Sequence, residues 1–217
     1  MSRLVERIRP AQGNPEGALV LLHGRGADEH DLLPLIEVLD PDQRLVGVTP
    51  RAPCAGEQGG FHWYDVERVG YPDPASFIAA AEALGDWLDD LPGRIDVAAE
   101  RIVLGGFSQG CVMAYATGLA ADREPPAALL ALVGFVPHVP GHALDLASAD
   151  RPPVVIAHGS RDPVIDVSFG RAARDELVAA GMDVTYHETP VEHTIDAAWL
   201  PGLRRAIGLA LRPPALG

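Results

Sequence analysis

Short apolar runs alternate with longer stretches of helical periodicity along most of the chain. Helical spacing of apolar residues covers 28–39, 74–91, 109–121, 167–180 and 194–211, with Pro92-Gly93 expected to stop the second helix. This alternation predicts an α/β fold, with a mainly parallel central sheet and helices on both faces. Functional loops of such sheets follow the carboxyl ends of the strands. The apolar runs, typical of strands buried on both faces, lie at 18–22, 44–48, 101–107, 129–136 and 154–157, and a last strand is expected at 183–187.

The segment 51–73 interrupts this alternation. It contains four glycines and two prolines, and no helix or strand period runs through it. Loops of this length are usually functional sites or insertions. The aromatic residues Phe61, Trp63 and Tyr64 either wall a substrate site or pack the loop onto the body of the protein, and the sequence leaves both interpretations open.

The length of 217 residues favours one domain, covering 1–217 without a separate lid domain. All 17 basic residues are arginine, so no lysine is present for a phosphate-binding loop, a Schiff base or a Ser-Lys dyad. A net charge of −13 argues against nucleic acids and anionic membranes as main partners. Cys54 and Cys111 are too few for a zinc site or a disulfide framework, and we expect neither a metal nor a cofactor.

The apolar runs are also too short to cross a bilayer, which takes about 18 consecutive apolar residues. The first ten residues, MSRLVERIRP, lack the apolar region of a secretory signal. We therefore expect a cytoplasmic protein with no stable membrane insertion.

The strongest chemical signal is the sequence GFSQG at 106–110, which matches the pattern G-x-S-x-G. It follows a predicted strand and opens a predicted helix, which is the setting of a nucleophile elbow. Side chains two positions before and after the serine would clash in so tight a turn, and glycines stand at both positions. The pattern predicts Ser108 as a nucleophile. The alternative is a glycine-rich turn whose serine takes no part in chemistry.

A serine hydroxyl needs a general base at neutral pH. His193 lies in the loop between the last predicted strand and the last predicted helix, at the expected edge of the sheet. His187 competes with it, but lies inside the strand pattern, where a structural role is expected. His193 is therefore the predicted base.

The base needs an orienting carboxylate, and Asp162 follows the strand at 154–157. Asp162 could instead be a turn residue before Pro163. Asp166, four residues on, fits a helix N-cap. The chain order serine, aspartate, histidine is that of α/β-hydrolases, which favours Asp162 as the third member.

Two backbone N–H groups are candidates for holding a negatively charged oxygen. That of Gln109 begins the helix after the serine, and that of Arg25 lies in His23-Gly24-Arg25-Gly26, after an early strand. Flanking glycines allow an ester to approach the Arg25 backbone closely. The Arg25 side chain points to solvent or a nearby carboxylate, or else binds anionic substrates. His23 is expected to hold the loop.

Together these residues resemble the phospholipase/carboxylesterase family of α/β-hydrolases, relatives of the acyl-protein thioesterases. The resemblance implies an α/β-hydrolase fold, a triad of Ser108, Asp162 and His193, and an oxyanion hole made by the N–H groups of Arg25 and Gln109. It also implies serine esterase activity without metal or cofactor. The matching segments are LLHGRGADEHDLLPL (21–35), FHWYD (61–65), GFSQG (106–110), AHGSRDPVI (157–165) and EHTI (192–195).

Two positions depart from the family pattern. Glu192 stands where members usually have glycine, and a carboxylate there raises the pKa of His193 if it points inward. Arg25 stands where the thioesterase branch typically has leucine, which argues against protein depalmitoylation. The string HGRGADE is more similar to that of small bacterial esterases.

We therefore expect a serine carboxylesterase that hydrolyses short- to medium-chain esters of small molecules through an acyl-enzyme. Lysophospholipid or thioester hydrolysis, peptide or lactone hydrolysis, and a hydrolase fold kept as a binding module are the alternatives. Cys111, one turn into the helix after the serine, is expected in the core, and a homodimer remains open.

Overall fold

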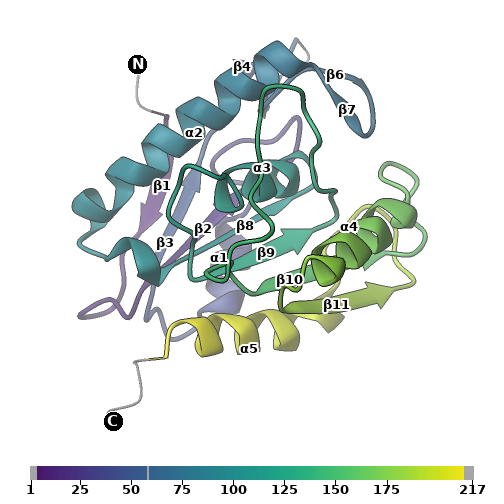
Figure 1. Ribbon diagram of the computed structural model, residues 1–217. Helices are drawn as coiled ribbons and strands as arrows, with labels where there is room; N and C mark the ends of the chain where they lie inside the picture. Colours follow the sequence, from purple (N-terminus) through teal and green to yellow (C-terminus); the bar gives the residue numbers. More distant parts are fainter. Residues whose placement is uncertain (1–3, 58, 213–217) are drawn as a thin grey trace.

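A mainly parallel sheet forms the centre of the protein in the computed structural model, which describes residues 4–57 and 59–212. Over these residues seven strands lie in the order β1-β3-β2-β8-β9-β10-β11 (Figure 1). Neighbouring strands are parallel except β1 and β3, so the predicted α/β fold is confirmed. The strands are β1 (Glu6–Arg9), β2 (Ala18–Leu22), β3 (Val46–Pro50), β8 (Ile102–Phe107), β9 (Ala128–Leu132), β10 (Val154–Gly159) and β11 (Val184–Thr189).

Helices cover both faces of this sheet, as the alternation predicts. α2 contacts α3, which lies on β8 and β9, whereas α1 contacts α5, which packs on β9 and β10. Figure 1 shows α2 and α3 above the sheet and α5 below it. No helix in the described part of the chain is long and apolar enough to cross a membrane. The helices are α1 (Leu33–Leu39), α2 (Pro74–Ile95), α3 (Gln109–Gly118), α4 (Val167–Ala179) and α5 (Leu200–Ala210), with 3₁₀ turns at Ala99–Arg101 and Ala197–Trp199.

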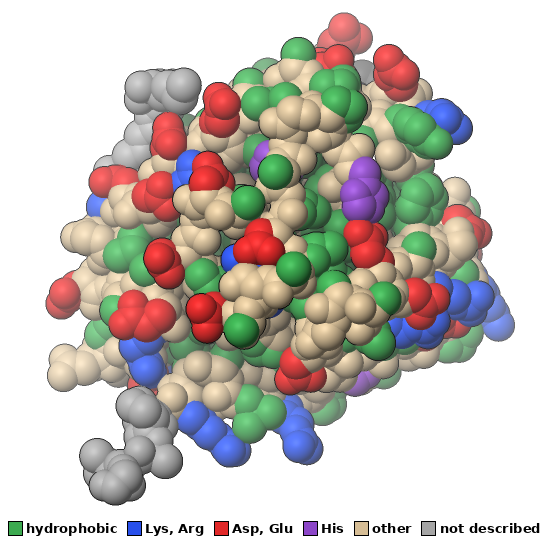
Figure 2. All heavy atoms as spheres, in the orientation of Figure 1, with side chains coloured by type: hydrophobic (Ala, Val, Ile, Leu, Met, Phe, Trp, Pro, Cys, Tyr) green, Lys and Arg blue, Asp and Glu red, His purple; other side chains and the backbone are tan. Residues whose placement is uncertain are grey.

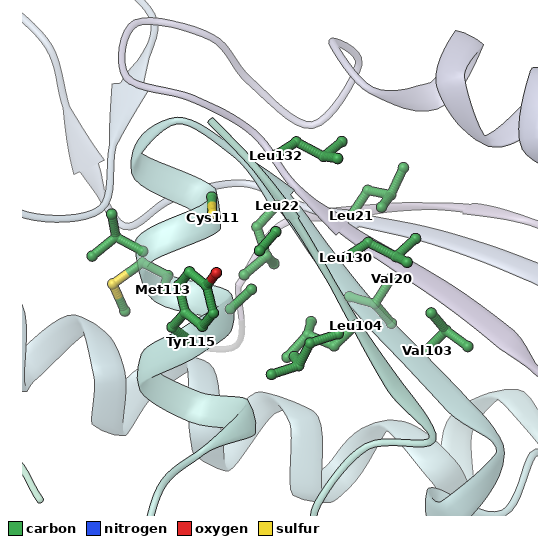
Figure 3. Close-up of a cluster of buried hydrophobic side chains, with 14 of the residues drawn as sticks. Val20, Leu21, Leu22, Val103, Leu104, Cys111, Met113, Tyr115, Leu130 and Leu132 are labelled. Atoms are coloured by element: carbon green, nitrogen blue, oxygen red, sulfur yellow. The ribbon is translucent and has the colours of Figure 1, made fainter. Parts of the chain in front are cut away.

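The middle of the sheet is buried on both faces. Every residue of β2, β9 and α3 is buried, which explains why these segments are almost wholly apolar. Figure 3 shows leucines of β2, β8 and β9 in one cluster with Cys111, Met113 and Tyr115 of α3. Cys111 is fully buried, and burial raises the pKa of its thiol. The predicted core position of Cys111 is therefore confirmed.

The helix predicted at 28–39 is shorter than expected. It begins only at Leu33, because the residues before it form turns. The Asp28 carboxylate accepts a hydrogen bond from the His30 N–H at 2.8 Å, which is the geometry of an Asx turn. A local side-chain bond has replaced the first helical turn.

The helix predicted at 74–91 is longer than expected. As α2 it continues past the predicted stop at Pro92 and ends at Ile95. The side chain of Arg94 holds the last turn through one contact with β1 and one within the helix. The Arg94 guanidinium lies 2.5 Å from the Glu6 carboxylate of β1 and 5.4 Å from the centre of the Trp87 ring. These contacts offset the backbone hydrogen bond that the proline cannot make.

β1 is a strand that the hydrophobic pattern does not predict, because its sequence ERIR has no buried residue. Side chains attach it to the sheet. The Arg9 guanidinium binds the Asp40 carboxylate, which is only 4% exposed. Asp40 also accepts hydrogen bonds from the N–H groups of Arg44 and Leu45, both at 3.0 Å. One buried carboxylate thus joins β1, the end of α1 and the segment leading into β3.

The segment 51–73 forms two small hairpins. The tip of the second hairpin packs on α4. Its Gly70 lies so close to Phe169 of α4 that a Cβ at this position would be 2.9 Å from the Phe169 ring. Figure 1 shows this second hairpin projecting from the body of the protein at upper right. The pairs are β4 (Cys54–Ala55) with β5 (Phe61–His62), and β6 (Val66–Arg68) with β7 (Tyr71–Pro72).

We expect Asp40→Ala to lower the free energy of unfolding by about 3 kcal/mol, because it leaves the half-buried Arg9 charge and two backbone N–H groups without their acceptor. Urea unfolding measures this change. Asp42→Ala, at an exposed neighbouring position, is the matched control and should stay within about 0.5 kcal/mol of the wild type. Equal effects of the two substitutions would contradict the structural role of Asp40.

Candidate active site

Ser108 lies in the tight turn between β8 and α3, at the carboxyl edge of the sheet. Its backbone has φ 55° and ψ −117°, a strained conformation for a residue with a side chain. A Cβ at Gly106 would lie 2.3 Å from the Gly110 carbonyl oxygen, and one at Gly110 would lie 2.1 Å from the Leu22 carbonyl oxygen. Only glycine fits at both positions, so the turn has the shape that G-x-S-x-G predicts.

Three side chains from different loops form a chain of hydrogen bonds. The Oγ of Ser108 lies 3.0 Å from Nε2 of His193, and Nδ1 of His193 lies 2.7 Å from Oδ2 of Asp162. A carboxylate can only accept, so Nδ1 carries the proton toward Asp162. Nε2 then accepts from the serine hydroxyl. The structure brings together the three residues predicted as nucleophile, base and orienting carboxylate.

Asp162 is held in one orientation by the backbone of its own loop. Its side chain is fully buried, and Oδ1 accepts hydrogen bonds from the N–H groups of Val164 at 2.7 Å and Ile165 at 2.8 Å. Asp166 instead caps α4, where its side chain accepts from the Ser168 N–H at 2.9 Å. The predicted capping role of Asp166 is therefore confirmed.

The loop that carries His193 lies against the end of β10. A Cβ at Gly159 would lie 2.4 Å from the Val191 carbonyl oxygen, which also accepts a hydrogen bond from the Arg161 N–H at 3.1 Å. The Phe107 ring lies 5.0 Å from the imidazole and limits its movement. The glycine at the end of β10 thus permits the close approach that carries His193 to the edge of the sheet.

His187 and Glu192, the other candidates near the base, take no part in this chain of hydrogen bonds. His187 lies on β11 and packs against α5, where a Cβ at Gly202 would lie 2.4 Å from its Nε2. Glu192 is exposed to solvent.

Two backbone donors lie in the wall of the same cavity as Ser108. The N–H groups of Arg25 and Gln109 donate to no other residue that the structure describes. Gln109 is the first residue of α3, where the helix dipole favours negative charge. Both N–H groups are therefore candidates for an oxyanion hole, as the sequence predicts.

The Arg25 loop is paired with β5. The N–H of Gly26 donates to the Phe61 carbonyl at 2.8 Å, and the N–H of Phe61 donates to the Ala27 carbonyl at 2.8 Å. The backbones approach so closely that a Cβ at Gly60 would lie 2.0 Å from the Gly26 carbonyl oxygen. The first hairpin therefore positions the loop that carries the Arg25 N–H.

The Gln109 side chain binds the backbone that follows β5. Its Oε1 accepts from the Trp63 N–H at 2.8 Å, and its Nε2 donates to the Tyr64 carbonyl at 2.7 Å. The Trp63 indole N–H in turn donates to the His23 carbonyl at 2.9 Å. The two candidate oxyanion donors are therefore linked to each other through residues 63–64.

An ion pair anchors the far end of the same loop. Glu29 is 1% exposed, and its carboxylate oxygens lie 2.5 and 2.6 Å from Nε and Nη2 of Arg51. The hydrogen bond from Arg51 lowers the pKa of Glu29 to about 2. The Arg51 guanidinium also lies 4.4 Å from the centre of the Phe61 ring.

A cavity of about 240 Å³ opens beside Ser108. Of the three aromatic residues expected as its wall, only Tyr64 lines it. Trp63 is fully buried beneath the loop, and Phe61 lies under Arg51, so these two pack the loop onto the body. Of the two interpretations that the sequence leaves open, packing is therefore favoured for Phe61 and Trp63, because the hydrogen bonds of β5 and Gln109 turn both away from the cavity.

Sequence reasoning missed the rest of the cavity wall. Val112 follows Ser108 on α3 at helical spacing, and Phe135 lies in the loop after β9, one of the strand ends where sites occur. Arg68 and Tyr71 come from the β6–β7 hairpin. The predicted strand at 129–136 included Phe135, whereas β9 ends at Leu132 and leaves Phe135 in the loop. The hairpin residues had no signal in the sequence.

The sequence matches the model of a known protein family over most of its length. Residues 4–208 match the family model described as Phospholipase/Carboxylesterase. The chain belongs to the phospholipase/carboxylesterase family. This confirms the resemblance drawn from the motifs, and with it the α/β-hydrolase fold.

The relatives of this family member are hydrolases. Acyl-protein thioesterase 1 of Yarrowia lipolytica is 29% identical over 189 residues, covering 78% of this chain and 79% of that protein. Among solved structures, esterase PE8 is 29% identical with a TM-score of 0.79, covering 94% of this chain and 97% of its own. The Bacillus cereus carboxylesterase, 23% identical with a TM-score of 0.79 over 95% and 94% of the two chains, shares the fold. The protein is thus a serine hydrolase that acts on ester bonds.

Two buried histidines support the loops of this esterase. His23 Nδ1 lies 2.7 Å from the Gly24 carbonyl, and Nε2 accepts from the Ala52 N–H at 3.0 Å, so His23 holds its loop as predicted. His158 Nε2 lies 2.9 Å from the Ile165 carbonyl in the Asp162 loop. Burial lowers the pKa of both histidines below the usual 6.5, so both are neutral in the folded protein near pH 7.

We expect the free energy of unfolding to decrease as the pH falls from 7.5 to 5. A histidine whose pKa is lowered by folding contributes stability that is complete above about pH 6.5 and is lost as the pH falls through its folded pKa. Each histidine contributes at most about 1.4 kcal/mol per pH unit. Urea unfolding at several pH values measures the slope.

His158→Gln should flatten this slope, although it lowers stability at every pH through the lost bond to Ile165. Glu29, with its pKa of about 2, loses its contribution only below about pH 4.5 and does not interfere. A variant with the wild-type slope would show that His158 is not a source of the pH dependence.

Proposed function

We propose that this protein is a serine carboxylesterase that hydrolyses short- to medium-chain esters of small molecules through an acyl-enzyme. The observation that carries the proposal is the hydrogen-bond chain from Ser108 Oγ through His193 to Asp162, at 3.0 and 2.7 Å. It provides a hydroxyl, an accepting nitrogen in line with it and a fixed carboxylate behind that nitrogen. The family of the chain supports the same reaction class.

The first step forms an ester on the enzyme. The Oγ of Ser108 attacks the carbonyl carbon while its proton passes to Nε2 of His193. The carbonyl oxygen becomes negative and is held by the N–H groups of Arg25 and Gln109, each worth roughly 3–4 kcal/mol in the transition state. The C–O bond to the alcohol then breaks, and His193 returns the proton to the leaving oxygen.

The second step repeats this chemistry with water. His193 Nε2 takes a proton from water, whose oxygen attacks the acyl carbon. The bond to Ser108 Oγ breaks, and the serine recovers its proton from His193. Asp162 stays ionised throughout and stabilises the imidazolium that forms twice in the cycle.

The size and lining of the cavity favour acyl groups of short to medium length. Its volume of about 240 Å³ lies below the roughly 300–1,000 Å³ usual for small-molecule sites. Tyr64, Val112, Phe135 and Ile165 supply apolar wall. A long acyl chain would extend past these residues into solvent.

Thioesters are a second candidate substrate, because several curated relatives are named acyl-protein thioesterase 1. The proposed steps apply to a thioester with a thiol as leaving group. Arg25 stands at the cavity wall where an apolar residue suits a long acyl chain, which argues against the thioesters of long-chain fatty acids.

We expect p-nitrophenyl esters from acetyl to dodecanoyl to be hydrolysed with a maximum at short or medium chains. Ser108→Ala should remove the activity. Asp162→Asn should lower kcat by about 10³-fold or more, because an amide cannot hold the tautomer that His193 needs. Hydrolysis rates at saturating ester measure both effects.

Asp166→Asn is the matched control for Asp162→Asn. It makes the same chemical change four residues away in the same loop, and asparagine caps a helix about as well as aspartate. Its kcat should stay near that of the wild type. Near-full activity of Asp162→Asn, or activity that survives Ser108→Ala, would refute the proposed triad.

We expect Gly60→Ala to lower kcat by about 10- to 100-fold, because its Cβ would lie 2.0 Å from the Gly26 carbonyl oxygen and displace the loop that carries the Arg25 N–H. Steady-state kinetics with p-nitrophenyl butyrate measure the loss. Circular dichroism and thermal unfolding establish that the variant is folded.

Gly59→Ala tests whether the fall in kcat comes from the contact between Gly60 and Gly26 or only from strain in the backbone. Gly59 also has a positive φ, of 94°, but its Cβ would meet nothing within 4 Å. It should therefore lose stability without a comparable loss of kcat. An equal fall in kcat for the two variants would exclude the proposed role of the Gly60–Gly26 contact.

A further inference from the structure

The cavity beside Ser108 carries positive charge in an acidic protein. The chain has a net charge of −13, and Figure 2 shows acidic side chains spread over the visible face. The described residues that line this cavity include two arginines, Arg25 and Arg68, and no aspartate or glutamate. The cavity thus concentrates a charge opposite to that of the protein as a whole.

Neither guanidinium is neutralised by another residue in the described part of the chain. Among the described residues, Arg25 and Arg68 form no ion pair and no side-chain hydrogen bond, whereas Arg9, Arg51 and Arg94 are each bound to a carboxylate. An arginine without a carboxylate keeps its donors available for a ligand, and its planar fork matches a carboxylate or phosphate.

The Arg68 side chain is held at the cavity wall by an aromatic ring and not by a carboxylate. Its guanidinium lies 3.4 Å from the centre of the Tyr71 ring, and both residues line the cavity. Stacking on a ring face positions a guanidinium while leaving its N–H groups in the plane free. The hairpin that carries both residues is fixed on α4 through Gly70 and Phe169.

Arg25 reaches the cavity from the opposite loop. Its charge acts on the Tyr64 phenol, whose pKa is raised by burial and lowered in part by Arg25. Tyr64 itself lines the cavity and is only 2% exposed to solvent.

We infer that this cavity accepts esters carrying a second, anionic group, a carboxylate or a phosphate, which Arg25 and Arg68 bind while Ser108 attacks the ester carbonyl. The inference rests on the proposed esterase function and narrows its substrates. Apolar wall from Val112 and Phe135 accommodates the carbon chain between the two groups.

The test compares matched pairs of esters. Mono-p-nitrophenyl adipate and p-nitrophenyl hexanoate differ by a carboxylate in place of the terminal methyl group, and 4-(hexanoyloxy)benzoate and 4-(hexanoyloxy)benzamide place the charge on the alcohol part. We expect kcat/KM to be about tenfold higher or more for the anionic member of at least one pair. A hydrogen bond between a guanidinium and an anionic group stabilises a complex enough to produce a ratio of this size. The preference should shrink with added NaCl.

The preference of each variant is the ratio of its kcat/KM for the anionic ester to its kcat/KM for the neutral ester. Arg25→Gln and Arg68→Gln should each reduce this ratio about tenfold. Arg205→Gln removes one exposed positive charge from α5, away from the cavity lining, and should keep the preference. Adipate and inorganic phosphate, used as inhibitors of hexanoate hydrolysis, distinguish a carboxylate from a phosphate as the bound anion.

Binding without turnover separates this inference from the proposed function. Adipate or phosphate should raise the Tm of Ser108→Ala, and the shift should disappear when Arg68→Gln is added. Serine-dependent hydrolysis with no anionic preference and no such shift would overturn the inference and leave the esterase proposal standing. A shift in Tm without any serine-dependent hydrolysis would overturn the esterase proposal, and the ester part of the inference with it, while supporting anion binding in the cavity.

Discussion

The site depends on one close contact between backbones, where the start of α3 lies against the end of β2. A Cβ at Gly110 would lie 2.1 Å from the Leu22 carbonyl oxygen and 2.6 Å from that of His23. No other residue permits this approach. It places the first N–H of α3 beside the loop that begins at His23, and it forces Ser108 into a strained conformation at the edge of the sheet. The buried apolar faces of α3 and the central strands hold the strain in place.

A second layer of polar contacts makes the arrangement rigid. Gln109 provides a backbone donor at the site, and its side chain binds the backbone of Trp63 and Tyr64. Trp63 then binds the His23 carbonyl, which closes a ring of contacts around the candidate oxyanion hole. The segment 51–73 therefore acts mainly as a support for the site, while Tyr64 and the second hairpin line the cavity. Bulky aromatic residues are used here for support, while two arginines provide the cavity with charge.

Sequence patterns predicted the fold well where burial determined the pattern. The apolar runs of β2, β8, β9 and β10 were identifiable because both faces of these strands are covered. β1 escaped detection because a buried ion pair between Arg9 and Asp40 attaches it, and such pairing leaves no periodic signal. The end of α2 was misplaced for the same reason, since Arg94 and Glu6 are distant in the sequence.

The sequence by itself determined the chemistry of the site: a serine between two glycines, a later aspartate and histidine, and a glycine-flanked arginine after an early strand. Steric limits at a tight turn act over a few residues, so they leave a local pattern that can be recognised. Only the tertiary structure decided that Trp63 faces the core and Tyr64 the cavity, and that Arg68 joins Arg25 there. Those positions depend on hydrogen bonds and packing between segments far apart in the chain, and no single segment encodes such contacts.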